Sequence, residues 1–574
     1  MKRGKLFAAL LAAAVLMGSP LAGSISEQKA SAEEVIVISE NGGESQNSQE
    51  ILSGEVTEDG EVLFAAKAPA TTSAAKLNVC RGESTGKIRI QARVSRPVKS
   101  KDNYYYLCRV DADGDPETIV QKVKKVKSGT QNLKFILNTD GHPEYVMNRY
   151  CIAVKTQKGK KMACYTRISS PKNVETPEKV AANKAKYKVP KTKKGLQTVD
   201  IGELTKTKSK TAFCNLQMST VMTKSAETIP YEYNGKTYYF SQIGGYRLYV
   251  SQCNQKGIQV TMQIMLDWTD ATKDVIAASS PQAGSSFYAW DALTPASRQK
   301  MEAVFAFLGE MFGQDDCYVS NWILGNEVNS CNAWNNPGNM NKTEYVKQYS
   351  EAFRCLYNAV RANRSSSKVF MCVDQLWNLR VQGYGAKEII DGVAGRLKRI
   401  QKNVEWNLAY HAYPFPLTDC RFWLSASNPD YGHYMTNSTS SPVVSLNNLS
   451  VMTKYIRNKY GSNTRVILSE QGFTSTQSQQ DQAAAIALGY YIAACDPMVD
   501  AFIIRSYADT ADEMAQGLHM GLAGKKAMKV FQYMDSSSSL KYAEKYLKSQ
   551  VGAGWKSWVP GFSTSKITKT YRKG

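Results

Sequence analysis

The sequence of 574 residues predicts an α/β protein in which a (β/α)8 TIM barrel follows a small all-β sandwich domain. Three observations favour this fold. Short segments within residues 61–170 alternate apolar and polar side chains, the pattern of strands with one buried face. From residue 196 onward, strand-like and helix-like segments alternate, as repeated βα units do. Two of the apolar segments end in a glutamate, and the carboxyl ends of barrel strands are where barrel enzymes place catalytic groups.

The first 32 residues have the features of a secretory signal peptide. Lys2, Arg3 and Lys5 precede the apolar residues 6–17, and small residues at 30–32 form a cleavage site. Residues 33–60 are rich in Glu, Ser and Gly and predict a disordered tether. We therefore expect a secreted, extracellular protein, and attachment to the cell wall is one form that this location can take. No later segment reaches the roughly 18 to 20 apolar residues of a membrane span, so none is expected.

Residues 61–170 predict an immunoglobulin-like or fibronectin-like β-sandwich. Ile88, Ile90, Ala92 and Val94 alternate with polar residues, which places them on one buried face. Turn residues separate this segment from others like it, as in sandwich domains. The other expected strands cover residues 104–110, 118–126, 132–137, 149–156 and 162–168.

Residues 171–195 contain three prolines and a dense series of lysines, a composition typical of an extended, solvated linker. The barrel is expected to follow as residues 196–574. Its eight strands are recognised as short runs rich in β-branched and aromatic residues, of which the third is the shortest. They are expected at residues 212–218, 258–266, 287–290, 319–325, 369–373, 404–410, 465–469 and 499–505.

Helices are expected between these strands. Thr294 and Pro295 form an N-cap and a first-turn proline, and apolar residues then recur at helical spacing through Phe312, which predicts a helix that packs on the core. Gly461 is expected to end another helix. The remaining expected helices cover residues 241–255, 344–362, 449–460, 479–494 and 525–534.

The formal net charge of +22 favours anionic partners such as an anionic cell-wall polymer. Nucleic acid is the competing partner, but many of the lysines are scattered through linkers and no zinc-finger or RNA-recognition pattern accompanies them. A solvated lysine surface accounts for the charge, and no nucleic-acid partner is expected.

The twelve cysteines include no Cys-x-x-Cys pair, so no metal site is predicted, and no cofactor is expected. Cys214, Cys372 and Cys495 lie in apolar segments and are interpreted as small core residues. An even number of cysteines in an exported chain leaves both disulfides and free thiols open for the others.

Polar residues at three strand ends carry a resemblance to a known group of enzymes. Asn326-Glu327 ends the fourth expected strand, His411-Ala-Tyr413 ends the sixth and Glu470 ends the seventh. Over residues 196–534 this arrangement resembles the retaining glycoside hydrolases of clan A. The chain also resembles a bacterial family of secreted barrel proteins defined only as a domain of unknown function.

The resemblance implies a role for each of these residues. Retaining hydrolysis needs a protonated carboxyl that donates to the leaving oxygen and an ionised carboxylate that attacks the sugar. Glu327 is expected to be the general acid and base and Glu470 the nucleophile. Asn326 would contact the sugar 2-hydroxyl, whereas His411 and Tyr413 would orient the substrate and donate to the nucleophile.

Two departures from the clan are visible. No arginine corresponds to the one that many members carry on the early strands, and residues 504–507 stand where members have a tryptophan. Trp268, Trp334 and Trp377 are candidate stacking platforms for sugar rings, because their apolar faces match the C–H faces of pyranoses, although each of them would also fit the rim of a barrel.

The sequence therefore predicts a secreted glycoside hydrolase that cleaves poly- or oligosaccharide by a retaining two-glutamate mechanism. The alternative is a non-catalytic polysaccharide- or cell-wall-binding protein on a glycosidase-like barrel. The presence of both Glu327 and Glu470 favours the enzyme, because a protein that only binds need not keep them.

Overall fold

A computed structural model describes most of the chain after residue 73. The predicted signal peptide and tether, and the first residues of the predicted sandwich, lie outside the described part. The described residues are 74–111, 114–126, 128–158, 162–223, 228–280 and 285–568.

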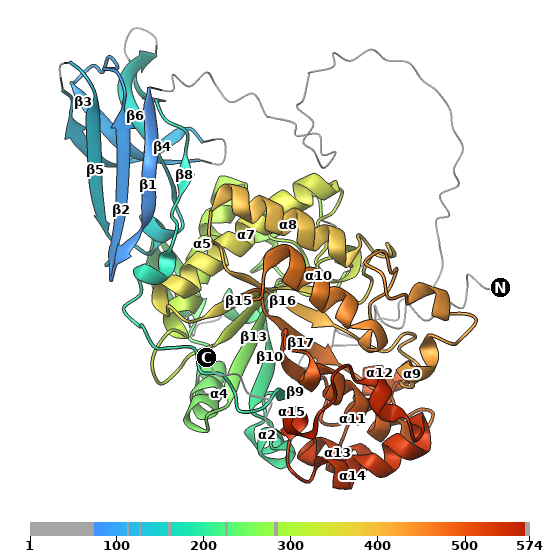
Figure 1. The fold of residues 1–574 in the computed structure, drawn as a ribbon. Helices are drawn as coiled ribbons and strands as arrows, with labels where there is room; N and C mark the ends of the chain where they lie inside the picture. The colour runs from blue at the N-terminus through green and yellow to red at the C-terminus, as the bar shows by residue number, and fades with distance from the viewer. Residues whose placement is uncertain are drawn as a thin grey trace, which may run out of the picture.

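The N-terminal region consists of two antiparallel sheets (Figure 1). The alternation predicted for β2 is confirmed, since Ile88, Ile90, Ala92 and Val94 are all buried. The inward side chains of both sheets join one apolar cluster. One sheet contains β1 (Ala75–Ser84), β2 (Lys87–Val94) and β5 (Gln131–Asn138), and the other contains β4 (Pro116–Lys124), β3 (Tyr104–Val110), β6 (Arg149–Lys158) and β7 (Met162–Arg167), with β8 (Lys172–Asn173) paired to β6.

The C-terminal region is a closed barrel in which every neighbouring pair of strands is parallel. Side chains such as Phe213, Phe370 and Ile503 fill its interior, so the barrel is a packed core. Its strands in order are β9 (Lys194–Gln197), β10 (Thr211–Gln217), β13 (Gln259–Met265), β14 (Asn321–Leu324), β15 (Lys368–Asp374), β16 (Trp406–His411), β17 (Val466–Gln471) and β18 (Val499–Ile504).

A helix follows each barrel strand and covers the outside (Figure 1). These helices are α2 (Ile201–Thr207), α4 (Gly244–Gln255), α5 (Pro295–Met311), α7 (Lys342–Asn363), α8 (Ala386–Ile400), α10 (Ser450–Tyr460), α11 (Gln479–Cys495) and α13 (Lys526–Tyr533). Within the described ranges, no helix combines the length and apolar character needed to traverse a lipid bilayer.

The prediction of the third barrel strand is wrong. Residues 287–290 form only isolated bridges with Ile276 and Asn336, inside the connection between β13 and α5. The first barrel strand is β9, which begins within the predicted linker. The strands expected first and second are therefore the second and third, whereas those from β14 onward keep their expected numbers.

Two lysines explain why the sequence of β9 resembles a linker. Lys194 is fully buried and pairs with Asp535 at 2.9 Å. The ammonium group of Lys193 donates to the carbonyls of Ala493 and Asp496, each at 2.9 Å, where α11 ends. A cation there offsets the partial negative charge of the helix terminus. These lysines anchor the start of β9 to the ends of α11 and α13, in contrast to the solvated spacer that their composition predicts.

A buried cluster of charges lies where the N-terminal sheets meet α5 and α7. Arg354, only 1% exposed, binds Glu351 through two nitrogens, at 2.5 and 3.1 Å. Arg298 lies 3.7 Å from Glu302 in the same cluster. Asn358 on α7 donates to a backbone carbonyl of the N-terminal region at 2.7 Å. Polar contacts therefore join the two regions.

All twelve cysteines are free thiols, and all except Cys164 are buried. Cys214, Cys372 and Cys495 are core residues, as predicted. The question that the sequence left open is thus answered for this structure in favour of thiols.

Candidate active site

The acidic residue after β14 is aimed by an unusual backbone turn. Gly325 has a φ of 71°, and a side chain there would lie 2.8 Å from the Asn335 side-chain oxygen, so glycine is required. Glu327 itself has a φ of 36°, in the left-handed region that non-glycine residues seldom adopt. Such strain is concentrated at functional sites. Here it accompanies a carboxyl group directed to the barrel mouth.

His411, at the end of β16, joins the two predicted catalytic glutamates. Its Nδ1 lies 2.8 Å from Glu327 Oε1 and 3.5 Å from Glu470 Oε2. The two carboxylate oxygens cannot be farther apart than the sum of these distances. That sum is below the roughly 6.5 Å at which the carboxyl separation of inverting glycosidases begins. The structure therefore brings Glu327, Glu470 and His411 into one cluster.

The surroundings of Glu327 favour its protonated form. Burial, followed by the charges of Asp374 and Glu470, raises the pKa of Glu327 to about 7, although the hydrogen bond from His411 opposes the rise. Burial alone would lower the pKa of His411, but Cys372, Glu327 and Glu470 together raise it well above its usual value. The Cys372 thiol lies 3.3 Å from Nε2 of the ring.

Glu470 has a different environment. Its Oε1 accepts a hydrogen bond from Nη1 of Arg505, which follows β18, at 2.5 Å. Nε of the same guanidinium donates to Glu513 on α12 (Ala511–Ala515), also at 2.5 Å. Glu470 therefore has a guanidinium as its direct partner, whereas Glu327 has the imidazole of His411.

Asn326 and Tyr413 each present a polar atom without a hydrogen-bond partner to this cluster. Asn326 accepts from Gln263 at 2.9 Å through its oxygen, whereas its side-chain nitrogen is buried and has no partner. The Tyr413 hydroxyl is also buried without a partner, and burial and the charge of Glu470 raise its pKa well above the usual range. Unpaired buried polar atoms are rare in native proteins and call for an explanation.

The three tryptophans have different positions. Trp268, after β13, keeps part of its surface exposed. Trp377 is fully buried, donates to the Thr439 carbonyl at 3.1 Å and packs edge-on against Tyr410, so it presents no ring face to a substrate, contrary to expectation. Trp334, 1% exposed, belongs to an apolar cluster over the mouth.

This apolar cluster, here called the collar, consists of residues that lie at or after the carboxyl ends of barrel strands, the end of the barrel that also carries the two carboxylates. Glu327 is only 5% exposed and Glu470 only 2%. Met265 ends β13 and Trp334 ends the short helix α6 (Cys331–Trp334), whereas Met520 and Leu518 come from the loop after β18. Its members are Met265, Phe287, Trp334, Tyr413, Leu417, Leu518 and Met520.

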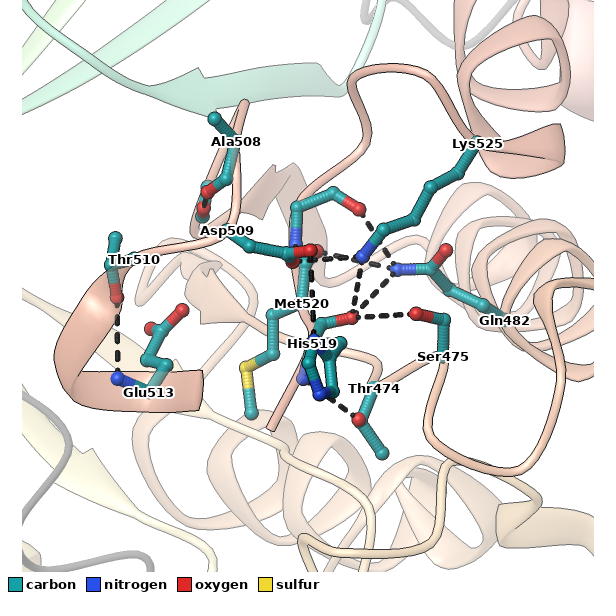
Figure 2. Close-up of polar contacts among 12 residues, drawn as sticks. Thr474, Ser475, Gln482, Ala508, Asp509, Thr510, Glu513, His519, Met520 and Lys525 are labelled. Atoms are coloured by element: carbon teal, nitrogen blue, oxygen red, sulfur yellow. Dashed lines mark hydrogen bonds and ion pairs between the residues drawn. The ribbon is translucent and has the colours of Figure 1, made fainter. Parts of the chain in front are cut away.

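Hydrogen bonds tie the loop after β18 to the loop after β17 (Figure 2). The backbone N–H of His519 donates to the Thr474 hydroxyl at 3.0 Å, and its carbonyl accepts from Ser475 at 2.9 Å. Asp509 accepts from the Lys525 ammonium group at 2.8 Å. These bonds hold the loop that carries Glu513 and Met520 against the barrel.

Four residues of the site were not predicted from the sequence as site residues, namely Arg505, Glu513, Cys372 and Asp374. Asp374 ends β15 and is held by the Asn329 amide at 2.6 Å and the Ser330 hydroxyl at 2.5 Å, which fixes the loop after Glu327. The signal available for Arg505 and Asp374 was their position at a strand end. No sequence signal marked Glu513. Among the described residues, no group of three or more His, Cys, Asp or Glu side chains is arranged to hold a metal ion.

A family model matches residues 186–558, a span that covers the whole barrel. The chain belongs to the family of unknown function DUF5722. This match agrees with the resemblance to a family defined only as a domain of unknown function. No curated protein matches the DUF5722 chain.

Solved structures similar to this DUF5722 protein include glycoside hydrolases. The hyperthermophilic β-glucosidase of Pyrococcus furiosus has 12% identity and a TM-score of 0.39, over 61% of this chain and 85% of that one. A GH5 xyloglucanase of Bacteroides ovatus has 11% identity and a TM-score of 0.38, over 82% and 98%. Likenesses this distant assign no activity, so the chemistry of the site is inferred from its own geometry.

Proposed function

We propose that this protein is a secreted glycoside hydrolase that cleaves poly- or oligosaccharide by a retaining mechanism. The observation that supports it most directly is the pair Glu327 and Glu470, joined through His411. Glu327 would donate its proton to the leaving oxygen while Glu470 attacks the anomeric carbon. Glu327, then ionised, would take a proton from the water that releases the sugar.

The unpaired polar atoms of Asn326 and Tyr413 support the same proposal. A sugar hydroxyl in the mouth would accept from the Asn326 nitrogen and pair with the Tyr413 hydroxyl, which ends the cost of burying them unsatisfied. Because both carboxylates are buried, substrate must displace neighbouring side chains as it enters. Secretion and attraction to an anionic wall polymer are further parts of the proposal, which rest on the N-terminal sequence and the net charge of +22.

Two variants test the assignment of roles on a panel of activated aryl glycosides. Glu470→Gln should abolish turnover of every substrate, because the attacking group is lost. Glu327→Ala should spare substrates whose leaving group needs no proton, and added azide should partly restore its turnover by attacking the glycosyl-enzyme without base assistance.

Each other result has a definite meaning. If both variants kept the native rate, neither glutamate would be catalytic and the binding protein would be the better interpretation. An exchange of the two phenotypes would reverse the acid and the nucleophile. A native chain that cleaved no glycoside in a broad panel would remove the enzyme proposal.

A further inference from the structure

Glu513 is a third glutamate in the barrel mouth, and the two-glutamate reaction gives it no task. Its residue is only 1% exposed. Its Oε1 accepts from Arg505 Nε at 2.5 Å, while Nη1 of the same guanidinium donates to Glu470 at 2.5 Å. The Glu513 Oε2 is buried without a partner. One guanidinium thus lies between two carboxylates, of which only one is placed to react.

The backbone around Glu513 is well anchored. The Thr510 hydroxyl caps α12 by accepting from the Glu513 N–H at 3.4 Å (Figure 2). The Leu518 N–H donates to the Glu513 carbonyl at 2.9 Å. Asp509 accepts from the Gly521 N–H at 2.7 Å. These contacts, with those to the loop after β17, hold the Glu513 carboxylate at a fixed place beside Arg505.

We propose that Glu513 is a positioning residue that keeps Arg505 paired while Glu470 is consumed as the nucleophile. The proposal rests on the proposed function. When a Glu470 oxygen bonds to the anomeric carbon, the bond to the leaving oxygen breaks and that oxygen takes the proton of Glu327. The Glu470 carboxylate thereby becomes a neutral glycosyl ester and no longer carries a negative charge.

The buried guanidinium loses the charge of Glu470 at this step. Removing one partner of a buried ion pair is strongly unfavourable, because the other charge remains desolvated. Glu513 is the carboxylate that remains beside Arg505 at 2.5 Å. It therefore lowers the cost of forming the glycosyl-enzyme. It also shares the pull of the guanidinium, which leaves the Glu470 carboxylate more reactive.

The first test is a stability cycle in the full chain that needs no substrate. Glu513→Gln and Glu470→Gln each leave Arg505 with one carboxylate, so each should lower Tm only slightly. In the double variant, both side chains that contact Arg505 are neutral amides. Its decrease in Tm should exceed the sum of the two single decreases by about 5 °C or more. Additive losses would overturn the sharing of Arg505.

Two further variants keep this test decisive. If the double variant does not fold, replacement of Arg505 by Met in the same chain should restore folding, because the guanidinium that has lost both carboxylates is then absent. Failure to restore folding would count against the proposal. Asp512→Asn, an exposed neighbour on α12, is the matched control and should behave as the native chain.

The second test is kinetic and uses a 2,4-dinitrophenyl glycoside that the native chain cleaves. Glu513→Gln should slow formation of the glycosyl-enzyme about 10- to 100-fold, and Glu513→Asp should recover much of the rate. Glu513→Gln, whose amide has the size of the carboxylate but no charge, should not recover the rate that Glu513→Asp recovers, because the charge beside Arg505 is what the step requires.

A lowered rate in Glu513→Gln that Glu513→Asp does not recover would indicate a merely structural role for Glu513 and would overturn the proposal. A native chain inactive on every glycoside would instead refute the proposed function, and with it the catalytic task of Glu513. The stability cycle would still decide whether Arg505 is shared, so the two failures are distinguishable.

Discussion

Two glutamates in enclosed clusters, Glu351 and Glu327, have opposite electrostatics. Burial alone would raise the pKa of Glu351, but the charges of Arg354, Arg149 and Arg298 bring it below its usual value. Burial also raises the pKa of Glu327, and there the neighbouring carboxylates add to the rise, so that it reaches about 7. The neighbouring charges thus favour the ionised form of Glu351 and the protonated form of Glu327.

The difference lies in the charges each cluster supplies. The cluster under the N-terminal sheets surrounds its glutamate with arginines, which favours a fixed ion pair and a stable interface between the two regions. The mouth places Glu327 near two acidic groups and a single histidine, an arrangement that costs stability and provides a proton donor. A titratable group perturbed in this way and placed in a mouth is a mark of function.

The largest stability effect is expected from breaking the compensated cluster. Glu351→Gln removes the charge that Arg354 binds through two nitrogens, and Arg354 would stay buried. Loss of one partner of a buried pair should lower the free energy of unfolding by about 3 kcal/mol. Urea denaturation measures it. Turnover of an activated glycoside should stay unchanged. A loss of turnover without a loss of stability would contradict the assignment of a structural role to the Glu351 cluster.

The same substitution in the mouth should have the opposite sign. Because the pKa of Glu327 in the folded chain lies above its unfolded value of 4.5, its contribution to stability is complete below pH 4.5 and is lost as pH rises through about 7. Glu327→Gln cannot ionise, so at pH 8 it should be more stable than the native chain by roughly 1 to 3 kcal/mol.

The gain should shrink toward pH 5, where Glu327 of the native chain is protonated. Urea denaturation of both chains at pH 5 and pH 8 checks this, and Glu351→Gln is the matched comparison. A Glu327→Gln variant that was less stable at both pH values would show that the two clusters do not differ as described.

The pH dependence of turnover tests whether the raised pKa of Glu327 serves catalysis. General-acid catalysis needs the protonated form of Glu327, so kcat/KM for substrates with poor leaving groups should fall as pH rises through about 7. The fall should approach tenfold per pH unit. Dinitrophenyl glycosides, which need no proton, should lack this alkaline limb, and its presence for them would assign the limb to another group.

The smallest effect is expected from the tryptophans. Trp268 is partly exposed beside the mouth, and removing its ring face by Trp268→Ala should raise KM about three- to tenfold with little change in kcat. The control is Trp377→Phe, at a fully buried ring, which should lower stability and leave KM unchanged. Kinetics on an oligosaccharide would separate the two.

The sequence predicted those site residues that are marked by the residues directly before them in the chain. An apolar run that ends in a carboxylate is visible without a structure, and this pattern pointed to Glu327 and Glu470. The pairing of Arg505 with Glu513 depends on how a loop returns to the mouth, which no periodicity encodes. Trp377 reads like Trp268 in sequence, because a strand-end tryptophan carries no sign of the direction its ring will take. The strand β9 was missed because its lysines are typical of a solvated segment.

The position of β9 after two buried lysines, Lys193 and its own first residue Lys194, also bears on how the two regions can be separated. β9 pairs with β18 on one side and with β10 on the other, so its removal would leave two unpaired strand edges. Gly195 sits in this seam, where a side chain would lie 2.8 Å from Ile503. The sequence suggests that the barrel begins at residue 196. A fragment that started there would lack the first half of β9 and would expose unpaired backbone N–H and C=O groups on the neighbouring strands, and such exposed strand edges promote aggregation. The end of the segment whose composition resembles a linker is therefore a strand that the barrel needs in order to close.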